Sequence, residues 1–395
     1  MRFWKPCLRQ ARRNMPTGRE CTRCVMDMSD PDIAFDAHGV CNHCRAFERD
    51  RNARAAVGDD GGERLDRAVQ RIRARGAGRP YDCVIGVSGG VDSSFVALRA
   101  VELGLRPLAV HVDGGWNTEL AVANIENLVK RLGIDLETVV VDWDEMRDLQ
   151  LAFFRAGLSN CDIPQDHAFV AATWRTALRR GVRDILSGVN LATEYISARW
   201  GHTFGDLTHL KAVHARFGKR ALRRYPTFNF LQMALWWPHV RGVRETRLLD
   251  LFPYVKADAK AVLIEKLGWR DYGGKHYESA FTKFYQAHYL PVKFGFDKRR
   301  IHLSNLILSG QMTREEAQSE LAAELYEPRR LAEDKAFIAK KLGISLDEFE
   351  AILAAPPRRH EEFPTNTALV QRYQALTAVL RRWLGRADAA GASRA

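Results

Sequence analysis

Small and hydroxyl-bearing residues gather in one short stretch of this chain, directly after a β-rich run. Residues 86–94 read Gly-Val-Ser-Gly-Gly-Val-Asp-Ser-Ser and follow residues 81–85. A helical pattern comes next, at Phe95, Val96, Leu98 and Val101. A strand, a glycine-rich loop and a helix in this order turn backbone N–H groups and a positive helix end toward one point. Such a point suits a phosphate group.

The side chains of this loop could complete a phosphate site. Ser88, Ser93 and Ser94 offer hydroxyl donors, and Asp92 offers a carboxylate that could hold Mg²⁺ against the phosphates. The loop lacks the Lys-Ser/Thr pair of a P-loop, and it is not a Gly-x-Gly-x-x-Gly motif. An ordinary glycine-rich turn is the alternative interpretation, but the order of the elements favours phosphate binding.

Four of the seven cysteines form two pairs with the spacing of metal ligands. The pairs are Cys21-Thr-Arg-Cys24 and Cys41-Asn-His-Cys44, and sixteen residues separate them. The sequence Asp-Ala-His-Gly at 36–39 predicts a hairpin turn that returns the second pair to the first. Four thiolates around one ion predict a structural zinc site with no open position, with His43 as a competing ligand. Disulfides and a redox-active pair are the alternatives, and the odd cysteine count favours a reducing, cytoplasmic setting.

A second set of charged side chains lies late in the chain. Residues 268–286 contain a Gly-Gly turn followed by Lys275, His276 and Glu278, and residues 293–300 read Lys-Phe-Gly-Phe-Asp-Lys-Arg-Arg. Lysine and arginine side chains here could bind the phosphates of ATP or an anionic sugar nucleotide. The alternative is a surface loop followed by an amphipathic helix that carries Phe281, Phe284 and Tyr285.

The elements that must position these residues alternate between strand and helix patterns from residue 81 onward. Strand patterns recur at 108–112, 137–141 and 184–188, and helical patterns at 118–132 and 168–180. This alternation predicts an α/β fold, a Rossmann-like doubly wound parallel sheet with helices on both faces.

Ligands bind at the carboxyl ends of the strands in such sheets. This rule adds Asp113, Asp142 and the turn at 187–190, which contains Gly188, to the candidate loop. Asp113 is a candidate ribose or adenine contact. It could equally be a turn residue before Gly114.

Composition and pattern divide the chain into four predicted parts. Residues 15–50 form a zinc-binding lobe, and residues 51–80 form a polar connector with one helix marked by Leu65, Val69 and Ile72. Residues 81–245 form the α/β domain. Because the alternation of strand and helix patterns ends beyond residue 240, residues 246–390 are predicted to form a mainly helical region. This region is expected to complete the substrate site. Either Met1 or Met15 could be the first residue translated.

The net charge of +12 is compatible with nucleic acid or with a polyanionic small molecule. The basic residues lie in short, scattered clusters, so charge does not decide between these ligands.

No apolar segment reaches the ~20 residues of a membrane span. The most apolar candidate, 228–237, is predicted to pack in a core or interface, with a peripheral membrane contact as the alternative. The basic N-terminus lacks the apolar core of a secretory signal.

With these motifs, the chain resembles the N-acetyl sugar amidotransferase family of the PP-loop (ATP pyrophosphatase) superfamily. The resemblance rests on the cysteine pairs, the loop at 87–94 and the segment Trp-Arg-Asp-Tyr-Gly-Gly-Lys-His-Tyr-Glu-Ser at 269–279. It extends to residues 293–300 and to the segment 341–345. The resemblance implies that an acetamido group of a nucleotide-activated sugar becomes an acetamidino group in lipopolysaccharide O-antigen biosynthesis. ATP would adenylylate the amide oxygen, with release of pyrophosphate and then AMP.

The resemblance also implies roles for individual residues. It assigns pyrophosphate binding to Ser88, Gly89, Gly90, Ser93 and Ser94, and Mg²⁺ binding to Asp92, with Asp113 and Gly188 as further nucleotide contacts. Asp92, Lys275 and Lys298 are the catalytic candidates. The candidate sugar-nucleotide contacts are Tyr272, Lys275, His276, Glu278 and Arg299. Ammonia would come from a separate class I glutaminase subunit, and no nucleic acid is implied.

The strongest rival interpretation is a tRNA sulfur-transfer enzyme of the same superfamily. Such enzymes use reactive thiols near the loop, and only Cys83 and Cys161 follow residue 44. Cys83 falls in a predicted buried strand, which disfavours this interpretation. A zinc-bearing scaffold with an inactive nucleotide site is a further alternative, and the intact loop argues against it.

Overall fold

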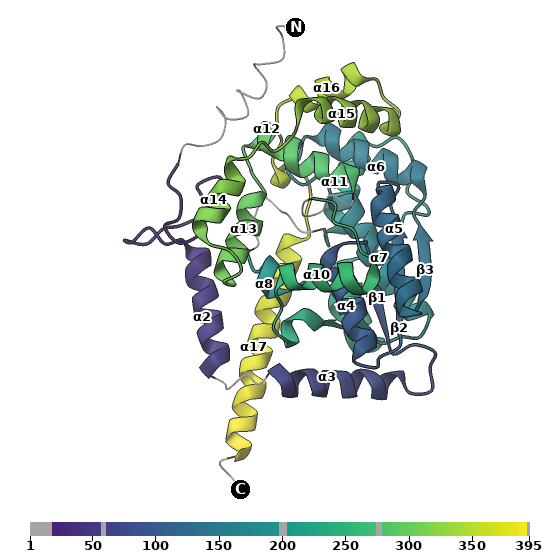
Figure 1. The fold of residues 1–395 in the computed structure, drawn as a ribbon, viewed down its shortest axis with the longest axis vertical. Helices are drawn as coiled ribbons and strands as arrows, with labels where there is room; N and C mark the ends of the chain where they lie inside the picture. The colour runs from purple at the N-terminus through teal and green to yellow at the C-terminus, as the bar shows by residue number, and fades with distance from the viewer. Residues whose placement is uncertain (1–17, 57–60, 197–203, 274–278, 393–395) are drawn as a thin grey trace.

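The computed structural model contains a five-stranded parallel sheet, whose labelled strands lie on the right in Figure 1. The structure describes residues 18–56, 61–196, 204–273 and 279–392. The strand order is β3-β2-β1-β4-β5, and every neighbouring pair is parallel. The strands are β1 (Cys83–Gly86), β2 (Pro107–Asp113), β3 (Asp135–Val140), β4 (Asp184–Ser187) and β5 (Arg244–Arg247).

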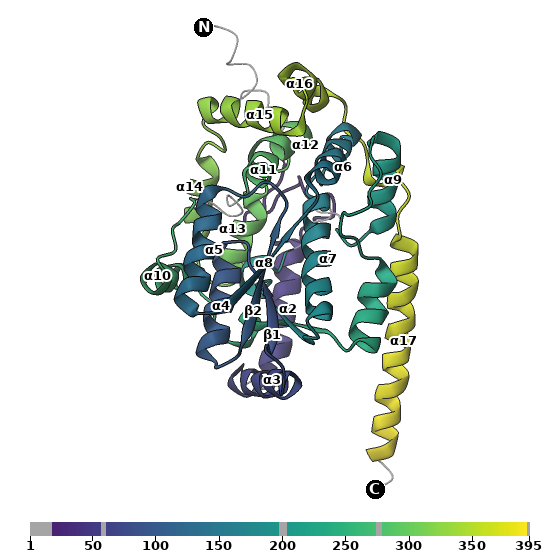
Figure 2. The same cartoon turned by 90° about the vertical axis from the view of Figure 1, so that its right-hand side faces the viewer.

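The two faces of the sheet are buried by different helices, which confirms the predicted doubly wound architecture. Ile85 points into a core made with α3 (Gly61–Gly76), α4 (Val91–Glu102), α5 (Glu119–Leu132) and α10 (Lys256–Leu267). Its neighbour Val84 points into the core on the opposite face, with α6 (Trp143–Ala156) and α7 (Ile163–Arg179). Successive strand residues face opposite sides, so a strand buried on both faces must be apolar throughout. Figure 2 shows α4 and α5 on one side of the strands and α7 on the other.

The N-terminal lobe consists of two short bridged turns and a helix, α2 (Asn42–Ala56). The predicted turn at 36–39 is present, because the N–H of Gly39 donates to Asp36 O and the N–H of Asp36 donates to Val40 O. Gly39 has φ +79°, which only glycine adopts without strain. The turn brings Cys41 back beside the first cysteine pair.

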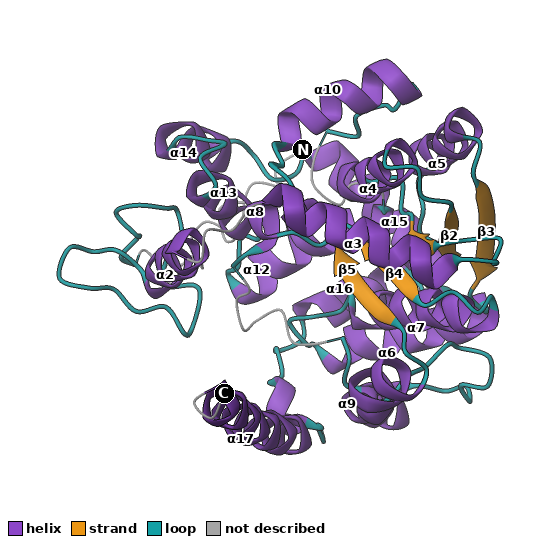
Figure 3. Ribbon diagram, turned by 90° about the horizontal axis from the view of Figure 1, so that it is seen from below, coloured by secondary structure: helices purple, strands orange, loops and turns teal. Residues whose placement is uncertain are grey.

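The region after the sheet is helical, and the long last helix extends away from the body (Figures 1 and 3). The elements are α8 (Leu191–Glu194), α9 (Leu207–Phe217), η1 (Gln232–Val240), η2 (Leu248–Leu251), α11 (Ala280–Phe284), η3 (Tyr285–Tyr289), α12 (Leu290–Phe294), α13 (Arg299–Leu308), α14 (Arg314–Ala322), α15 (Pro328–Leu342), α16 (Leu346–Ala354), η4 (His360–Glu362) and α17 (Thr367–Ala392). None of the helices in the described part of the chain has the length and apolarity that a membrane crossing requires.

Two predicted element limits need correction. The alternation does not end at residue 240, because Arg244–Arg247 forms the edge strand β5. Its sequence, Arg-Glu-Thr-Arg, is polar and largely exposed, so it carries no hydrophobic signal of a strand. The helix predicted at 168–180 begins at Ile163, since Pro164 at the first turn is compatible with a helix start.

Two apolar segments had more than one predicted environment, the one with Phe281, Phe284 and Tyr285 and the one at 228–237. Phe281, Phe284 and Tyr285 are all buried, as the amphipathic-helix alternative requires. In the segment 228–237, Trp237 is buried and stacks on Trp174 with 5.4 Å between ring centroids, whereas Trp236 is exposed.

Candidate functional site

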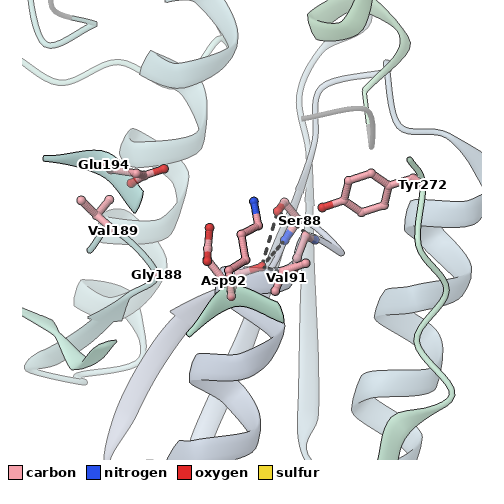
Figure 4. Close-up of a pocket in the computed structure, with 10 residues that line it drawn as sticks. Ser88, Val91, Asp92, Gly188, Val189, Glu194 and Tyr272 are labelled. Carbon is pink, nitrogen blue, oxygen red and sulfur yellow. Dashed lines mark hydrogen bonds between the residues drawn. The ribbon is translucent and has the colours of Figure 1, made fainter. Parts of the chain in front are cut away.

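A cavity of about 150 Å³ opens at the carboxyl ends of β1 and β4. The chain runs outward from β1 to β3 on one side of the sheet and from β4 to β5 on the other, so this is the topological switch point where α/β sheets bind ligands. Residues from four separate segments line the cavity: Ser88, Gly90, Val91, Asp92, Ser93, Gly188, Val189, Glu194, Lys256 and Tyr272. Figure 4 shows Asp92 and Glu194 across the cavity from Tyr272.

The loop between β1 and α4 has a shape that requires glycine. Gly89 has φ +79°, and a Cβ atom there would lie 2.6 Å from the carbonyl oxygen of Ala121. Gly90 is the N-cap of α4 and supplies no side chain to the N–H groups of the first helical turn. No N-cap side chain accepts hydrogen bonds from these N–H groups. An anion site at a helix N-terminus requires such uncapped N–H groups.

Asp92 is held in place by a tyrosine from the helical region. The hydroxyl of Tyr254 donates a hydrogen bond to Asp92 Oδ1. Burial, together with the negative charge of Asp92, raises the pKa of Tyr254 well above its usual value. Tyr254 therefore stays protonated and acts as a permanent donor that fixes the orientation of the Asp92 carboxylate.

The turn after β4 approaches the loop closely. A Cβ atom on Gly188 would lie 3.1 Å from the backbone nitrogen of Ser93. Asn190 caps the short helix α8 and donates from Nδ2 to Gly188 O at 3.1 Å. Because Gly188 has no side chain, the carboxyl ends of β1 and β4 can form one continuous wall.

The late segment at 269–279 meets this loop in its described part. Trp269 Nε1 donates to Gly89 O at 2.9 Å, and Tyr272 packs edge-on against Trp269. Asn124 of α5 exchanges two hydrogen bonds of 2.9 Å with the backbone of Arg270. The predicted residues Lys275, His276 and Glu278 lie outside the described residues.

The remaining predicted residues of the loop and the late segment lie apart from the cavity lining. Ser94 is fully buried, and its Oγ has no hydrogen-bond partner in the described part of the chain. The Arg299 guanidinium is engaged by Asp297 and by carbonyl oxygens of Glu320, Leu321 and Ala323. That arrangement fixes the end of α14.

Lys298 interacts electrostatically with the partly buried Asp166 carboxylate of α7. Its Nζ lies 6.0 Å from the ring centroid of Tyr285. Burial raises the pKa of Asp166 to about 8; the Asp162 and Glu194 carboxylates add to the shift, and the charge of Lys298 opposes it. Of these charged residues, Glu194 lines the cavity.

Asp113 lines a second cavity, of about 240 Å³, at the carboxyl ends of β2 and β3. Its Oδ1 accepts a hydrogen bond of 2.8 Å from the N–H of Gly115, so it caps the turn after β2. Lys341 projects into the same place, with Nζ 5.1 Å from the centroid of Trp143. Burial lowers the pKa of Lys341, and the Asp113 charge opposes that shift. The predicted contact of Asp113 with a nucleotide stays a prediction.

Three residues at the first cavity were not predicted from the sequence: Glu194, Lys256 and Tyr254. Glu194 follows the carboxyl end of β4 by seven residues, so the strand-end rule could have identified it. Lys256 and Tyr254 belong to the segment that precedes and begins α10, and no local motif marks them.

The four paired cysteines form a site that fits zinc. Their Sγ atoms all lie within 4.8 Å of one another, and all four side chains are fully buried. Cys21–Cys44, Cys24–Cys41 and Cys41–Cys44 are separated by 3.8, 3.7 and 3.6 Å. Four thiolates bound to one zinc in a tetrahedron lie about 3.8 Å apart, because the Zn–S bond is about 2.3 Å. His43 is hydrogen-bonded to Asp30 at 2.6 Å, as a neighbour of the site.

The two cysteines that follow residue 44 are unsuited to sulfur chemistry. Cys83 and Cys161 are both fully buried. Burial raises the pKa of Cys161 to about 12 and that of Cys83 still further. A reactive thiol needs access and a lowered pKa, so neither residue fits the sulfur-transfer alternative.

Parts of this chain are similar in sequence to known proteins. Residues 278–377 match the family described as LPS biosynthesis protein WbpG-like, C-terminal domain. An uncharacterized protein of Methanocaldococcus jannaschii is 23% identical over 284 residues, which are 68% of this chain and 84% of that protein. A GMP synthase [glutamine-hydrolyzing] of Thermus thermophilus is 31% identical over 144 residues, which are 35% of this chain and 26% of that protein.

Two solved structures match about half of this chain. The NMN synthetase of Francisella tularensis is 16% identical, and the match covers 47% of this chain and 72% of that one, with a TM-score of 0.28. A predicted subunit of a tRNA methyltransferase from Methanocaldococcus jannaschii is also 16% identical. That match covers 46% of this chain and 74% of the other, with a TM-score of 0.26.

Proposed function

We propose that the chain is the ATP-dependent synthetase subunit of an amidotransferase that converts an acetamido group on a nucleotide-activated sugar to an acetamidino group. The observation that carries the proposal is the loop of residues 88–94, which lines a cavity at the switch point of a parallel sheet. The match to a WbpG-like C-terminal domain supports a role in lipopolysaccharide biosynthesis. The similarity to a GMP synthase supports ligase-type chemistry.

The reaction follows from the poor leaving ability of an amide oxygen. That oxygen attacks the α-phosphorus of ATP, the bond from this phosphorus to pyrophosphate breaks, and an adenylylated imidate results. Ammonia then adds at the imidate carbon, AMP leaves with the former amide oxygen, and loss of a proton gives the amidine. No protein nucleophile is needed, so the protein must position the reactants and stabilise developing charge.

The lining residues match these tasks. The N–H groups at the start of α4 and the hydroxyls of Ser88 and Ser93 would bind the pyrophosphate. Lys256 adds a positive charge to the cavity wall, where negative charge gathers on the departing group. Mg²⁺, when bound, would neutralise phosphate charge, and Asp92 is the carboxylate oriented to hold it.

The acceptor sugar would lie between the cavity and the late segment. Tyr272 lines the cavity, and Lys298 lies beside the neighbouring acidic group. We assign Tyr272, Lys275, His276 and Glu278 to the sugar nucleotide. Ammonia would come from a partner glutaminase, and the reaction would take place in the cytoplasm, where the zinc thiolates stay reduced.

Product analysis tests this proposal. The chain is incubated with ATP, Mg²⁺, an ammonium salt and a panel of nucleotide-linked acetamido sugars, while AMP and pyrophosphate are measured. We expect AMP formation that depends on one sugar, whose mass changes by the replacement of one oxygen with NH. AMP formation that depends on unmodified tRNA and on no sugar would overturn the proposal in favour of sulfur transfer.

A further inference from the structure

The N-terminal lobe contacts Tyr195, the residue next to one that lines the loop cavity. Phe47 of α2 packs edge-on against Tyr195, with 5.0 Å between ring centroids and 87° between ring planes. The hydroxyl of Tyr195 also donates to Asp50 Oδ2 at 2.7 Å. Tyr195 is bonded along the chain to Glu194, which lines the cavity. One turn of α2 therefore holds the residue next to a cavity-lining carboxylate.

A second route joins the lobe to the same segment through α13. The N–H of Val25 donates to Ser304 Oγ at 3.2 Å, and the Val25 side chain is buried against Leu303 and Ala317. On the same helix, Asn305 Oδ1 accepts a hydrogen bond of 2.8 Å from the N–H of Ile196. The segment 194–196 is thus held by α2 of the lobe and by α13, which contacts the lobe.

Ion pairs reinforce the contact of the lobe with α13 and α14, which Figure 1 shows beside it. Arg300 donates to Glu20 at 2.7 Å and to Val25 O at 2.6 Å, and it lies 2.9 Å from Asp27. Arg314 donates to the carbonyl oxygens of Cys21 and Cys24, each at 3.2 Å. These two carbonyls belong to zinc-ligand candidates, so the cysteine cluster and the helical region share one hydrogen-bonded network.

The cysteine cluster also sets the direction of α2. Cys41 and Cys44 stand at the start of the helix, and Phe47 follows Cys44 by three residues. Residues three apart lie on the same face of a helix, so the metal-binding pair and the Tyr195 contact are on adjoining parts of one face. Fixing the cysteines fixes where Phe47 meets Tyr195.

From these contacts we infer that the N-terminal lobe is a positioning element of the ATP site, acting through Phe47 and Tyr195 to hold Glu194 in the cavity wall. The inference rests on the proposed function, since it takes the cavity as the nucleotide site. It assigns Phe47 and Tyr195 as positioning residues and Glu194 as the group that they position. The lobe would then act on this chain's own active site, and its role would require no binding partner other than the metal.

Binding of Mg²⁺ and α,β-methylene-ATP, whose α–β linkage resists cleavage, tests the inference in the full chain. We expect Phe47→Ala to weaken binding about tenfold, because the supporting ring is lost. Phe47→Leu retains apolar packing and should restore most of the affinity. Tyr195→Phe keeps the ring contact but loses the bond to Asp50, so a loss of about threefold is expected. Bound zinc, measured by metal analysis, should remain equal to that of the wild type in each variant.

A matched control and a double variant separate positioning from general damage. Glu48→Gln changes the neighbouring residue on α2 and breaks ion pairs with Arg23 and Arg45 inside the lobe, away from Tyr195. It should leave nucleotide binding unchanged. Phe47→Ala should add little to the loss caused by Glu194→Gln, because the positioned group is already altered.

The outcomes are distinguishable. Unchanged affinity in both Phe47→Ala and Tyr195→Phe would overturn the inference, and so would equal losses from Phe47→Ala with and without Glu194→Gln. Loss of zinc with recovery of affinity on adding zinc would place the role of Phe47 in metal binding and would also overturn it. If the wild-type chain binds no nucleotide analogue, the proposed function fails and the inference fails with it.

Discussion

At the scale of single residues, Asp92 is the carboxylate whose geometry is best defined, because Tyr254 orients it within the loop cavity. We predict that Asp92→Asn lowers the rate of AMP formation by about 100-fold or more, since charge stabilisation at the reacting phosphates is lost. Tyr254→Phe should have a smaller effect, of about tenfold, because the carboxylate remains but is less well oriented. Steady-state kinetics with the accepted sugar measures both.

The control for these variants is Glu126→Gln, which removes an exposed carboxylate on the same side of the sheet and should leave the rate unchanged. Retention of wild-type activity by Asp92→Asn, in protein that unfolds at the wild-type temperature, would exclude the proposed role of Asp92.

A buried histidine gives a prediction on pH. The Nδ1–H of His167 donates to Phe204 O at 2.7 Å, and its Nε2 accepts from the N–H of Phe228 at 3.2 Å, so the neutral ring satisfies both partners. Burial lowers the pKa of His167 to about 4. Because this lies below the unfolded value of about 6.5, the stabilisation is complete above pH 6.5 and is lost as the pH falls toward 4.

The measurement is the free energy of unfolding by urea at pH 7 and pH 5 for the wild type and for His167→Gln. Glutamine can donate and accept but does not titrate. We expect the wild type to lose about 2 kcal/mol more than the variant over this interval. An identical pH dependence for the two proteins would show that His167 is not kept neutral by the fold.

The sequence predicted those site residues that share a local pattern. Ser88, Gly90, Asp92 and Ser93 lie between one strand and the first turn of one helix, so the order of strand, glycine-rich loop and helix predicted that they meet at one point. Tyr254, Lys256 and Glu194 reach the same cavity from distant parts of the chain. The positions of Tyr254 and Lys256 depend on tertiary packing, which leaves no spacing signal in the sequence. Glu194 follows the carboxyl end of β4, so the strand-end rule could have identified it.

At the scale of elements, the N-terminal lobe has a small apolar core and a cysteine cluster that fits a metal ion. The buried apolar side chains in its described residues are the four cysteines, Val25 and Met26. We predict that the purified chain carries one zinc ion, and that Cys24→Ser lowers both the zinc content and the unfolding temperature. Binding of the metal supplies folding free energy in such small lobes.

Metal analysis and limited proteolysis check this prediction. Cleavage within residues 18–56 should become faster in Cys24→Ser or after treatment with a chelator. Cys161→Ala is the matched control, because it removes a fully buried thiol outside the cluster and should keep the zinc. A wild-type chain that contains no zinc and resists proteolysis equally with and without chelator would contradict the prediction.

The buried strands β1 and β2 were more predictable than the edge strand β5. β1 and β2 are apolar because both faces of the sheet are covered, so their sequences indicate strands. β5 lies at the edge and has a polar sequence without a hydrophobic strand pattern. Its strand conformation is instead fixed by backbone pairing with β4. The predicted division of the chain at residues 245 and 246 falls inside this strand.

At the scale of the whole molecule, the candidate site combines all parts of the chain. The sheet supplies the loop and the turn after β4, the helical region supplies Lys256 and Tyr272, and the N-terminal lobe contacts the segment beside Glu194. The positive net charge is compatible with a nucleotide and a sugar nucleotide, both polyanions.

The thiols of the molecule lead to a final prediction, on the source of nitrogen. In the part of the chain that the structure describes, each cysteine either belongs to the four-cysteine cluster or is fully buried. Hydrolysis of glutamine by a class I glutaminase needs an accessible thiolate, and burial raises the pKa of Cys161 to about 12. We therefore expect the purified chain to use ammonium salts and not glutamine.

The test compares AMP formation with ammonium chloride and with glutamine as the only nitrogen donor. The rate with ammonium should rise with pH, because the free base is the nucleophile that adds to the imidate. Cys83→Ala and Cys161→Ala should keep this activity if they fold, and addition of a partner glutaminase should make glutamine effective. Turnover with glutamine and the purified chain alone would mean that a nucleophile within this chain releases the ammonia, and the two-subunit proposal would have to be abandoned.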